Sequence, residues 1–333
     1  MKPDLSICIP TYNFGHLIGE TLDTIIPQLT GEVEIVVVDG AATDATTNVV
    51  QRYINLDGRL RYFRLEAKGG IDVDMAQAVS LTKGRYCWLF SADDYMKAGA
   101  VTRVLQEIKS NPGVMVCRHW NCNYDMTPIN EHPVLRDQKD ATYNLANSYE
   151  RLAYFRAALS SEAFFSFMSG LVISRHLWDM APLRKEFIGS CWAHSARLME
   201  LMSNGFTVKY LSDSYILRRG DNDSFMDQGV VNRYRIAIEG YHRIAEHFFG
   251  ADSEEAFHMR RVIRQELPLR YFIYAKYMTR RNPDRESIDL LDEIAEAHFS
   301  DRSLRNTVSY LTFRLLPAFV CEWAYRCYRR FIR

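Results

Sequence analysis

The 333-residue sequence lacks the features that mark several classes of protein. It has no run of eighteen apolar residues and no basic segment followed by a short apolar one, so we expect neither a membrane-spanning helix nor a secretory signal. It has no net charge, with 41 basic and 41 acidic residues, and we expect no nucleic-acid partner. The seven cysteines are scattered without a Cys-x-x-Cys pair, which predicts reduced thiols in a cytoplasmic protein.

A zinc site is not predicted either. Cys117, His119 and Cys122 lie close together, but no second pair of ligands follows at the spacing of a zinc finger. The chain does have an ordinary globular composition, 47% hydrophobic and 25% charged, which is sufficient for a large core.

Strand and helix signals alternate through the first 120 residues. Segments with helical spacing of apolar residues separate four apolar, strand-like runs. The runs are 5–10, 34–39, 60–64 and 86–90. Strands joined by helices of this length indicate a parallel sheet with right-handed crossovers. We therefore predict an α/β fold with a mostly parallel sheet flanked by helices.

The pattern changes after about residue 112. Residues 121–149 are polar and irregular, as in a binding loop, and the later strand candidates are short. These candidates are 114–117, 170–174, 208–211 and 215–217. After Asp227 the chain is mostly helical to its end. We predict a catalytic α/β domain over residues 1–220 and a helical region over 221–333.

Polar groups follow each of the four strand-like runs. Because the carboxyl ends of parallel strands meet at one edge, we expect these groups to share a pocket. Acidic and backbone groups for a base, an aromatic ring, and glycines that permit close approach together suit a nucleotide. The candidates are Pro10, Thr11, Tyr12, Asn13, Asp39, Gly69, Gly70, Asp72 and Asp93. Singly, Asp39 also suits a turn or helix cap, and Tyr12 also suits packing.

Two adjacent acids, Asp93 and Asp94, end the fourth run. They repel each other unless a cation lies between them, so we predict that Mg²⁺ or Mn²⁺ binds here and holds a phosphate-bearing substrate. The alternative is that one of them caps the following helix. Arg218 and Arg219 either add positive charge toward the phosphate from a mobile loop or lie in a solvated turn.

At this point the sequence resembles a known family. The motifs at 10–13, 38–44 and 83–94 are similar to those of family 2 glycosyltransferases of the GT-A fold, strongly over residues 4–110 and weakly to about 220. The resemblance implies that Pro10, Thr11 and Asp39 contact the nucleoside of a nucleotide-sugar donor. It also implies that Asp93 and Asp94 form the acidic metal motif.

The metal motif departs from the family pattern in one position. Ser91 stands where the family usually has a further acid, so Asp94 is the expected direct metal ligand.

A narrower resemblance concerns residues 69–76, 87–94 and 187–194. These stretches are similar to abequosyltransferase-type members of O-antigen assembly. That implies a CDP-sugar donor, abequose or a related deoxyhexose, and a lipid-diphosphate-linked oligosaccharide acceptor. The residues themselves do not distinguish cytidine from uridine, so a UDP-sugar stays open.

The catalytic base is the main departure from the family pattern. Family members usually present a Glu-Asp pair at the start of a helix in the second half, where the Asp acts as base. Here 190–195 lacks that pair, and His194 is the candidate, since an ordinary histidine titrates near neutrality. The alternatives for His194 are a structural role or a hydrogen bond to substrate.

The last residues, 315–333, mix arginines with Trp323, Tyr325, Tyr328 and Phe331. This composition is typical of a helix at a membrane interface, where each arginine near anionic lipid contributes about 1 kcal/mol. The alternative is a terminal helix packed on its own domain or on a partner subunit, as in a homo-oligomer. With a lipid-linked acceptor, we expect a peripheral protein on the inner face of the bacterial inner membrane.

Two functions are alternatives to a glycosyltransferase. A nucleotidyltransferase would carry a Gly-rich loop with lysine after the first strand, and 10–13 does not supply one. A non-catalytic nucleotide- or glycan-binding protein is compatible with the missing acid at the base position.

Overall fold

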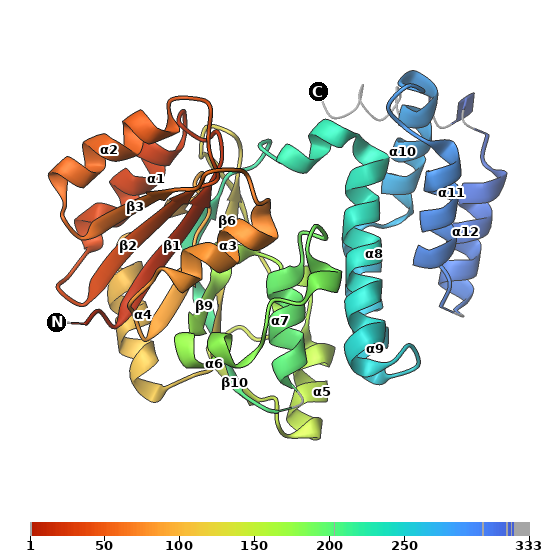
Figure 1. Cartoon of the computed structure of the whole chain (residues 1–333). Helices are drawn as coiled ribbons and strands as arrows, with labels where there is room; N and C mark the ends of the chain where they lie inside the picture. The colour runs from red at the N-terminus through yellow and green to blue at the C-terminus, as the bar shows by residue number, and fades with distance from the viewer. Residues whose placement is uncertain (1, 203, 302, 318, 321, 323–333) are drawn as a thin grey trace. The chain divides into compact units, whose positions relative to one another are not determined.

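A computed structural model describes residues 2–202, 204–301, 303–317, 319–320 and 322 (Figure 1). The chain divides into two compact units, Met1–Asn222 and Asp223–Arg333. The first unit is built on a sheet and the second on helices.

In the described residues of the first unit, one ten-stranded sheet has the order β3-β2-β1-β4-β9-β6-β10-β5, with β7 paired to β6 and β8 to β10. Strands β1, β2, β3, β4, β6 and β10 run in one direction, and β9 lies antiparallel between β4 and β6. The strands are β1 Leu5–Thr11, β2 Val33–Asp39, β3 Leu60–Arg64, β4 Tyr86–Leu89, β5 Tyr95–Met96, β6 Val114–Cys122, β7 Pro128–His132, β8 Ala141–Asn144, β9 Leu171–Ser174 and β10 Thr207–Arg218.

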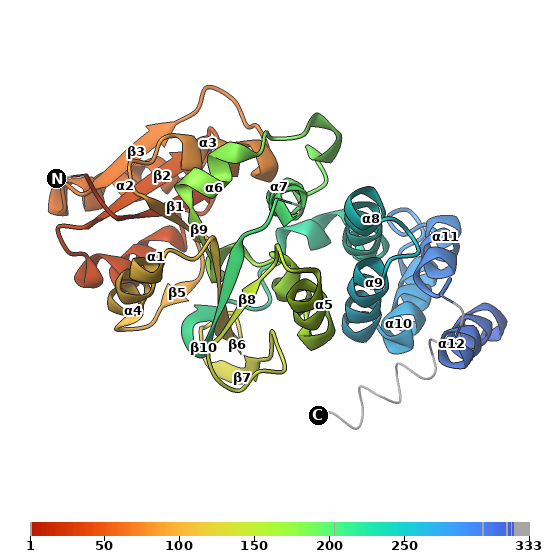
Figure 2. The same cartoon turned by 90° about the horizontal axis from the view of Figure 1, so that it is seen from below.

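Helices cover both faces of this sheet. Figure 2 shows α3 and α6 on one side of the strands and α1 and α4 on the other. Every residue of β1 and β2 is buried, because apolar side chains of both faces pack under these helices. The helices are α1 Ile18–Ile25, α2 Thr46–Leu56, α3 Ile71–Ser80, α4 Ala100–Glu107, α5 Ser148–Ala157, α6 Arg175–Met180 and α7 Ala193–Met202.

The predicted α/β fold with a mostly parallel sheet is confirmed, with three differences in detail. The stretch 121–149, expected to be irregular, contains β7 and β8, whose polar and largely exposed residues give no hydrophobic signal. The two short strands expected at 208–211 and 215–217 are one strand, β10, which is irregular on either side of Ser214. Strand β9 is antiparallel to its neighbours.

The second unit is helical, as predicted. Helix α8 ends at Gly250, whose φ of +83° suits glycine, and Pro268 is the N-cap of α10. The side chain of Glu286 accepts hydrogen bonds from the backbone nitrogens of Val230 (2.8 Å) and Val231 (2.9 Å), which satisfies the first turn of α8. The helices are α8 Val230–Phe249, α9 Glu254–Glu266, α10 Leu269–Arg281, α11 Ile288–His298 and α12 Leu304–Leu315.

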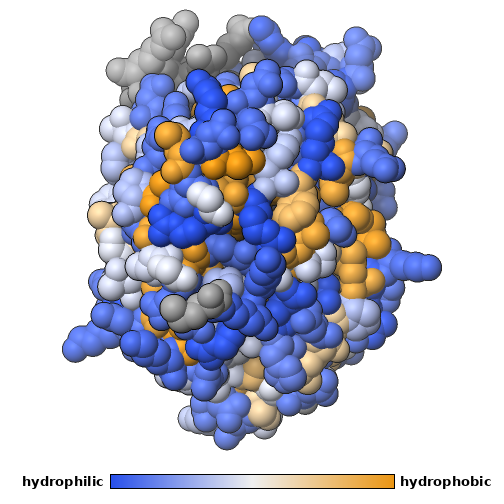
Figure 3. Space-filling view, turned by 60° about the vertical axis from the view of Figure 1, so that its left-hand side comes forward, coloured by the Kyte–Doolittle hydropathy of each residue, from blue (hydrophilic) through white to orange (hydrophobic). Residues whose placement is uncertain are grey.

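The surface combines hydrophilic areas with hydrophobic patches, as the face in Figure 3 shows. Within the described residues, none of the helices has the length and apolar character needed to span a membrane. Helix α12 exposes an apolar stripe of four residues spaced along one face. They are Leu304 (83% exposed), Val308 (53%), Leu311 (50%) and Leu315 (77%). The predicted interfacial residues Trp323, Tyr325, Tyr328 and Phe331 lie outside the described residues.

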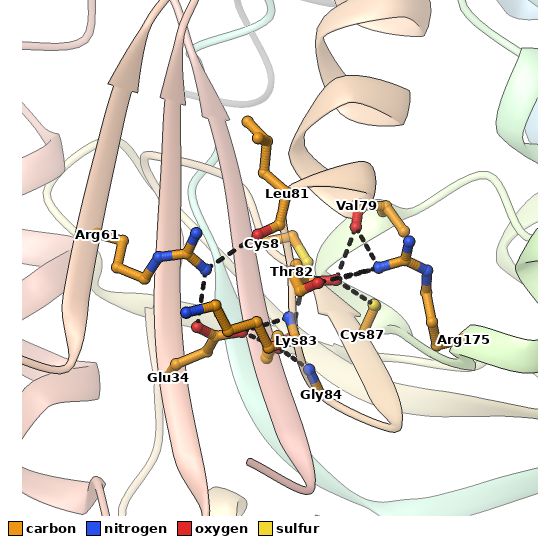
Figure 4. A network of polar contacts seen from close by, with 11 residues as sticks. Cys8, Glu34, Arg61, Val79, Leu81, Thr82, Lys83, Gly84, Cys87 and Arg175 are labelled. Atoms are coloured by element: carbon orange, nitrogen blue, oxygen red, sulfur yellow. Dashed lines mark hydrogen bonds and ion pairs between the residues drawn. The ribbon is translucent and has the colours of Figure 1, made fainter. Parts of the chain in front are cut away.

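A buried carboxylate joins the amino-terminal ends of three strands (Figure 4). Glu34, 7% exposed, accepts hydrogen bonds from Oγ of Ser6 (2.7 Å), the backbone nitrogen of Lys83 (2.6 Å) and Nη1 of Arg61 (3.0 Å). Such partners offset the desolvation of a buried anion. This end of the sheet is therefore held by internal polar contacts, and the opposite, carboxyl end carries the predicted site.

Candidate active site

The aspartate pair lies in the loop after β4 and is almost fully buried. Oδ2 of Asp94 accepts a hydrogen bond from Oγ of Ser169 (2.6 Å), and Oδ1 accepts one from the backbone nitrogen of Arg219 (2.9 Å). Asp93 accepts hydrogen bonds from Oγ of Ser91 and from Nδ2 of Asn222 (2.7 Å). Helix α4 begins after Gly99 without a side-chain cap, so the helix-cap alternative for the pair is wrong.

The electrostatics of Asp94 suit a cation. Burial and then the charge of Asp93 raise the pKa of Asp94 to about 7, against the opposing effect of its hydrogen bonds to Ser169 and Arg219. Each oxygen of Asp94 accepts one hydrogen bond from the protein, and a carboxylate oxygen has two lone pairs. The pair therefore keeps acceptor capacity for Mg²⁺ or Mn²⁺, and the residues fit such an ion.

Arg219 is buried and holds the aspartate loop in place. Its side chain is 3% exposed, and it donates through Nε to the backbone oxygen of Asp93 (2.9 Å) and through Nη2 to Oε2 of Glu20 (2.7 Å). Its guanidinium also stacks on the ring of Tyr95, 5.2 Å from the centroid. Arg219 therefore lies neither in a mobile loop nor in a solvated turn, and its predicted contribution of positive charge toward a phosphate stays a prediction. Arg218 ends β10 with its guanidinium over the ring of Phe167, at 5.6 Å.

The first two strands end side by side, with Pro10 opposite Val38 and Thr11 opposite Asp39. Thr11 is 5% exposed, and its hydroxyl has no hydrogen-bond partner among the described residues. The neighbouring loop carries two more predicted residues. The ring of Tyr12 lies 3.8 Å from Nζ of Lys68, and Oδ1 of Asn13 accepts a hydrogen bond from the backbone nitrogen of Thr43 (2.7 Å).

Asp39 is fully buried, and protein donors surround its carboxylate. Oδ1 accepts a hydrogen bond from the backbone nitrogen of Ala42 (2.6 Å). Oδ2 accepts hydrogen bonds from the hydroxyls of Tyr62 (2.5 Å) and Thr47 (3.2 Å), and Nη1 of Arg64 lies 3.3 Å away. These bonds give Asp39 the turn role left open by its sequence, and its contact with a nucleoside stays a prediction.

The loop after β3 is built around glycine. Gly70 has a φ of +83°, and a Cβ on Gly69 would lie 2.6 Å from Oδ1 of Asp74. Asp72 follows on α3, and its carboxylate accepts hydrogen bonds from the backbone nitrogens of Gly189 (2.9 Å), Cys191 (3.0 Å) and Ala193 (3.0 Å). Asp72 thus holds the start of α7, a structural role that sequence reasoning missed. Its predicted contact with a nucleotide remains a prediction.

His194 lies in the first turn of α7 and is 5% exposed. Burial lowers the pKa of His194, while the charge of Asp72 and the backbone of Phe165 and Ser166 oppose the shift. Neither ring nitrogen has a well-directed hydrogen bond among the described residues. The side chain is neutral at pH 7, and its role as base stays a prediction.

A second polar cluster was not predicted. His119 on β6, His132 on β7 and Glu162 bring one ligand atom each within 4.8 Å of one another. His119 is thus grouped with His132 and Glu162, which are 13 and 43 residues further along the chain. Cys117 and Cys122, its neighbours in sequence, are not part of this group. No sequence pattern indicated this cluster beyond the presence of His119. Strand β7, which brings His132 beside His119, is polar and was not predicted as a strand.

Comparisons with known proteins agree with this geometry. Residues 6–165 match the model of the family "Glycosyl transferase family 2". Abequosyltransferase RfbV of Salmonella typhimurium strain LT2 is 28% identical over 272 residues, which are 80% of this chain and 82% of RfbV. Glycosyltransferase GlyG of Streptococcus pneumoniae serotype 4 is 27% identical over 125 residues, 38% of this chain and 41% of GlyG.

Two solved structures share the fold. Residues 1–349 of S. aureus TarS, in complex with UDP-GlcNAc, superpose with a TM-score of 0.62 at 19% identity, covering 97% of this chain and 91% of that 1–349 chain. The mannosyltransferase PcManGT from Pyrobaculum calidifontis, in complex with GDP-Man and Mn²⁺, has a TM-score of 0.53 at 17% identity, covering 95% and 81%. Residues 6–165 of this chain are therefore a family 2 glycosyltransferase domain, set in a GT-A fold.

Proposed function

We propose that the chain is a metal-dependent hexosyltransferase that moves a sugar from a nucleotide-sugar donor to a hydroxyl acceptor. The observation that carries the proposal is the buried pair of Asp93 and Asp94 at the carboxyl edge of the sheet. Sugar transfer requires neutralisation of the leaving diphosphate, and a divalent cation bound by Asp94 would supply it. The Mn²⁺ complex of PcManGT, which has the same fold, supports this assignment.

The residues at the carboxyl edge of the sheet would bind different parts of the donor. Arg218 would add positive charge beside the diphosphate. The ends of β1 and β2 and the glycine loop would hold the nucleoside. Within this group, Thr11 offers a buried hydroxyl without a hydrogen-bond partner in the described structure, which suits a ligand contact. The nucleoside group is Pro10, Thr11, Tyr12, Asn13, Asp39, Gly69, Gly70 and Asp72.

For the donor, we propose CDP-abequose or the CDP-sugar of a related deoxyhexose, with a lipid-diphosphate-linked oligosaccharide of O-antigen assembly as acceptor. The similarity to abequosyltransferase RfbV, which extends over 82% of that protein, supports this choice. A UDP-sugar is the alternative, and the UDP-GlcNAc complex of TarS favours it.

The helical unit would bind the membrane surface or a partner subunit. The apolar stripe of α12 supports a peripheral position on the inner face of the bacterial inner membrane, with homo-oligomerisation as the alternative use. Flotation with anionic liposomes tests this on the full chain. Leu304→Glu with Leu311→Glu should reduce binding, and Leu56→Glu, at a leucine of the first unit that is 77% exposed, should not. Equal binding of all forms would refute a role for the α12 stripe, and no flotation of the wild type would refute the membrane position.

Calorimetry with CDP and UDP in the presence of Mn²⁺ tests the donor assignment. We expect CDP to bind more tightly than UDP, and we expect binding to weaken when Mn²⁺ is removed. Tighter binding of UDP would select the alternative donor, and no binding of either nucleotide would refute the proposal.

A non-catalytic nucleotide- or glycan-binding protein is the second candidate. The missing Glu-Asp pair at the start of α7 favours it. Incubation with a panel of CDP- and UDP-sugars and Mn²⁺ separates the two candidates. Nucleotide binding without hydrolysis or transfer of any sugar would establish the second.

A further inference from the structure

His132 and Glu162 form a histidine–carboxylate pair. Nε2 of His132 lies 3.0 Å from Oε2 of Glu162, and 20% of the His132 side chain is exposed while Glu162 is buried. Burial raises the pKa of Glu162, but at the acidic pH where this carboxyl titrates the charge and hydrogen bond of His132 outweigh burial and hold that pKa well below its usual range. Glu162 is therefore an anion that orients a solvent-accessible imidazole.

One short segment connects this pair to the aspartate loop. Glu162 stands at its beginning, and Ser169, near its end, donates the hydrogen bond to Asp94. Phe167, between them, packs against His119 (4.4 Å between ring centroids) and under the guanidinium of Arg218. The charge of Arg218 lowers the pKa of both Asp94 and Glu162, although burial and closer groups have larger effects on these two pKa values. Arg218 is also paired in register with Asn121, whose side chain contacts His132, so the pair is linked to the proposed diphosphate site through Arg218.

The hydrogen bonds determine which nitrogen of His132 is available. With the Nε2 proton donated to Glu162, Nδ1 carries a lone pair, and Nδ2 of Asn121 donates to it from 3.3 Å. A bond of this length is weak, so a sugar hydroxyl can replace the amide. His119 stacks on the same ring at 4.7 Å, and burial lowers the pKa of His119 to about 3, so His119 is uncharged.

We propose that His132, oriented by Glu162, is the general base that takes the proton of the acceptor hydroxyl, an inference that rests on the glycosyltransferase function proposed above. The hydroxyl oxygen bonds to the anomeric carbon of the donor. The bond from that carbon to the diphosphate breaks, and its electron pair leaves with the nucleoside diphosphate. The hydroxyl proton passes to Nδ1 of His132 and from there to solvent.

The cluster would also match a metal site, since His119, His132 and Glu162 are a known ligand set for Zn²⁺. The experiment therefore includes a metal analysis, which separates metal binding from proton transfer.

The test measures steady-state transfer by full-length His132→Ala, Glu162→Gln and the control His176→Ala, which removes an exposed histidine of α6. We expect His132→Ala to lower kcat ~100-fold or more, to leave the donor KM unchanged, and to regain activity with added imidazole. Glu162→Gln should lower kcat by about tenfold with the same KM, and His176→Ala should match the wild type. His132→Gln replaces His132→Ala if the latter does not fold.

Three results would overturn the inference. One is wild-type kcat in His132→Ala, and another is a loss of activity that imidazole does not restore, since that makes His132 structural. The third is zinc retained by the dialysed wild type and lost from Glu162→Gln. An inactive wild type would refute the proposed function together with this inference, whereas an active wild type with an active His132→Ala refutes the inference alone.

Discussion

The substitution Asp94→Asn tests the electrostatics of the site most directly. In the metal-free protein the pKa of Asp94 is about 7, against an ordinary value of 3.8. The folded protein therefore binds more protons than the unfolded chain between these values, so stability falls as pH rises through that window. The full difference corresponds to about 4 kcal/mol, and about 2 kcal/mol of it is lost between pH 5.5 and pH 8.

Asparagine has the same shape but does not ionise. Its oxygen still accepts the hydrogen bond from Arg219, and loss of the bond from Ser169 costs about 1 kcal/mol. With metal removed by a chelator, Asp94→Asn should therefore be more stable than the wild type at pH 8 by about 3 kcal/mol. At pH 5.5 this difference in the free energy of unfolding between Asp94→Asn and the wild type should be smaller by about 2 kcal/mol. Urea unfolding followed by tryptophan fluorescence measures both values.

Addition of Mn²⁺ completes the experiment. The wild type should gain stability with Mn²⁺ at pH 8, and Asp94→Asn should not, because the cation loses its carboxylate ligand. Asp213→Asn, at a side chain that is 68% exposed, is the matched control and should behave as the wild type. An Asp94→Asn protein less stable than the wild type at pH 8, or one that Mn²⁺ stabilises equally, would refute the reasoning.

Three further substitutions test separate parts of the molecule. Asp39→Ala should lower the free energy of unfolding by about 2–4 kcal/mol, because buried donors lose their acceptor, and should weaken CDP binding; unchanged affinity by calorimetry would confine Asp39 to its turn. Glu34→Gln should cost about 1–3 kcal/mol in urea unfolding and leave CDP affinity intact, since it lies at the other end of the sheet; weakened CDP binding would contradict this. If His132 is the base, His194→Ala should lower the melting temperature but keep kcat within about tenfold, and a loss above ~100-fold would instead make His194 the base, as the sequence predicts.

Sequence patterns were sufficient to predict that the ends of the first two strands lie side by side. Strands β1 and β2 have both faces apolar and carry Thr11 and Asp39 at their ends, so a parallel pairing brings these residues together, as the register shows. Local patterns reveal such strand ends directly.

The remaining contacts depend on distant parts of the chain. Arg219 reaches the aspartate loop from 125 residues away, and Asp72 bonds backbone groups more than 110 residues further on. His132 lies on β7, a polar strand without the alternation that predicts one. These positions follow from the antiparallel insertion of β9 and the β6–β7 hairpin, and no periodicity in the sequence encodes that topology.

The three bonds of Asp72 have a mechanical consequence. Asp72 stands two residues after Gly70, and its carboxylate accepts hydrogen bonds from backbone nitrogens just before α7 and at its first residue. Any displacement of the glycine turn by an arriving nucleotide would therefore pull on α7 and carry His194 with it. Donor occupancy would thus be communicated from the start of α3 to the start of α7 through a single side chain.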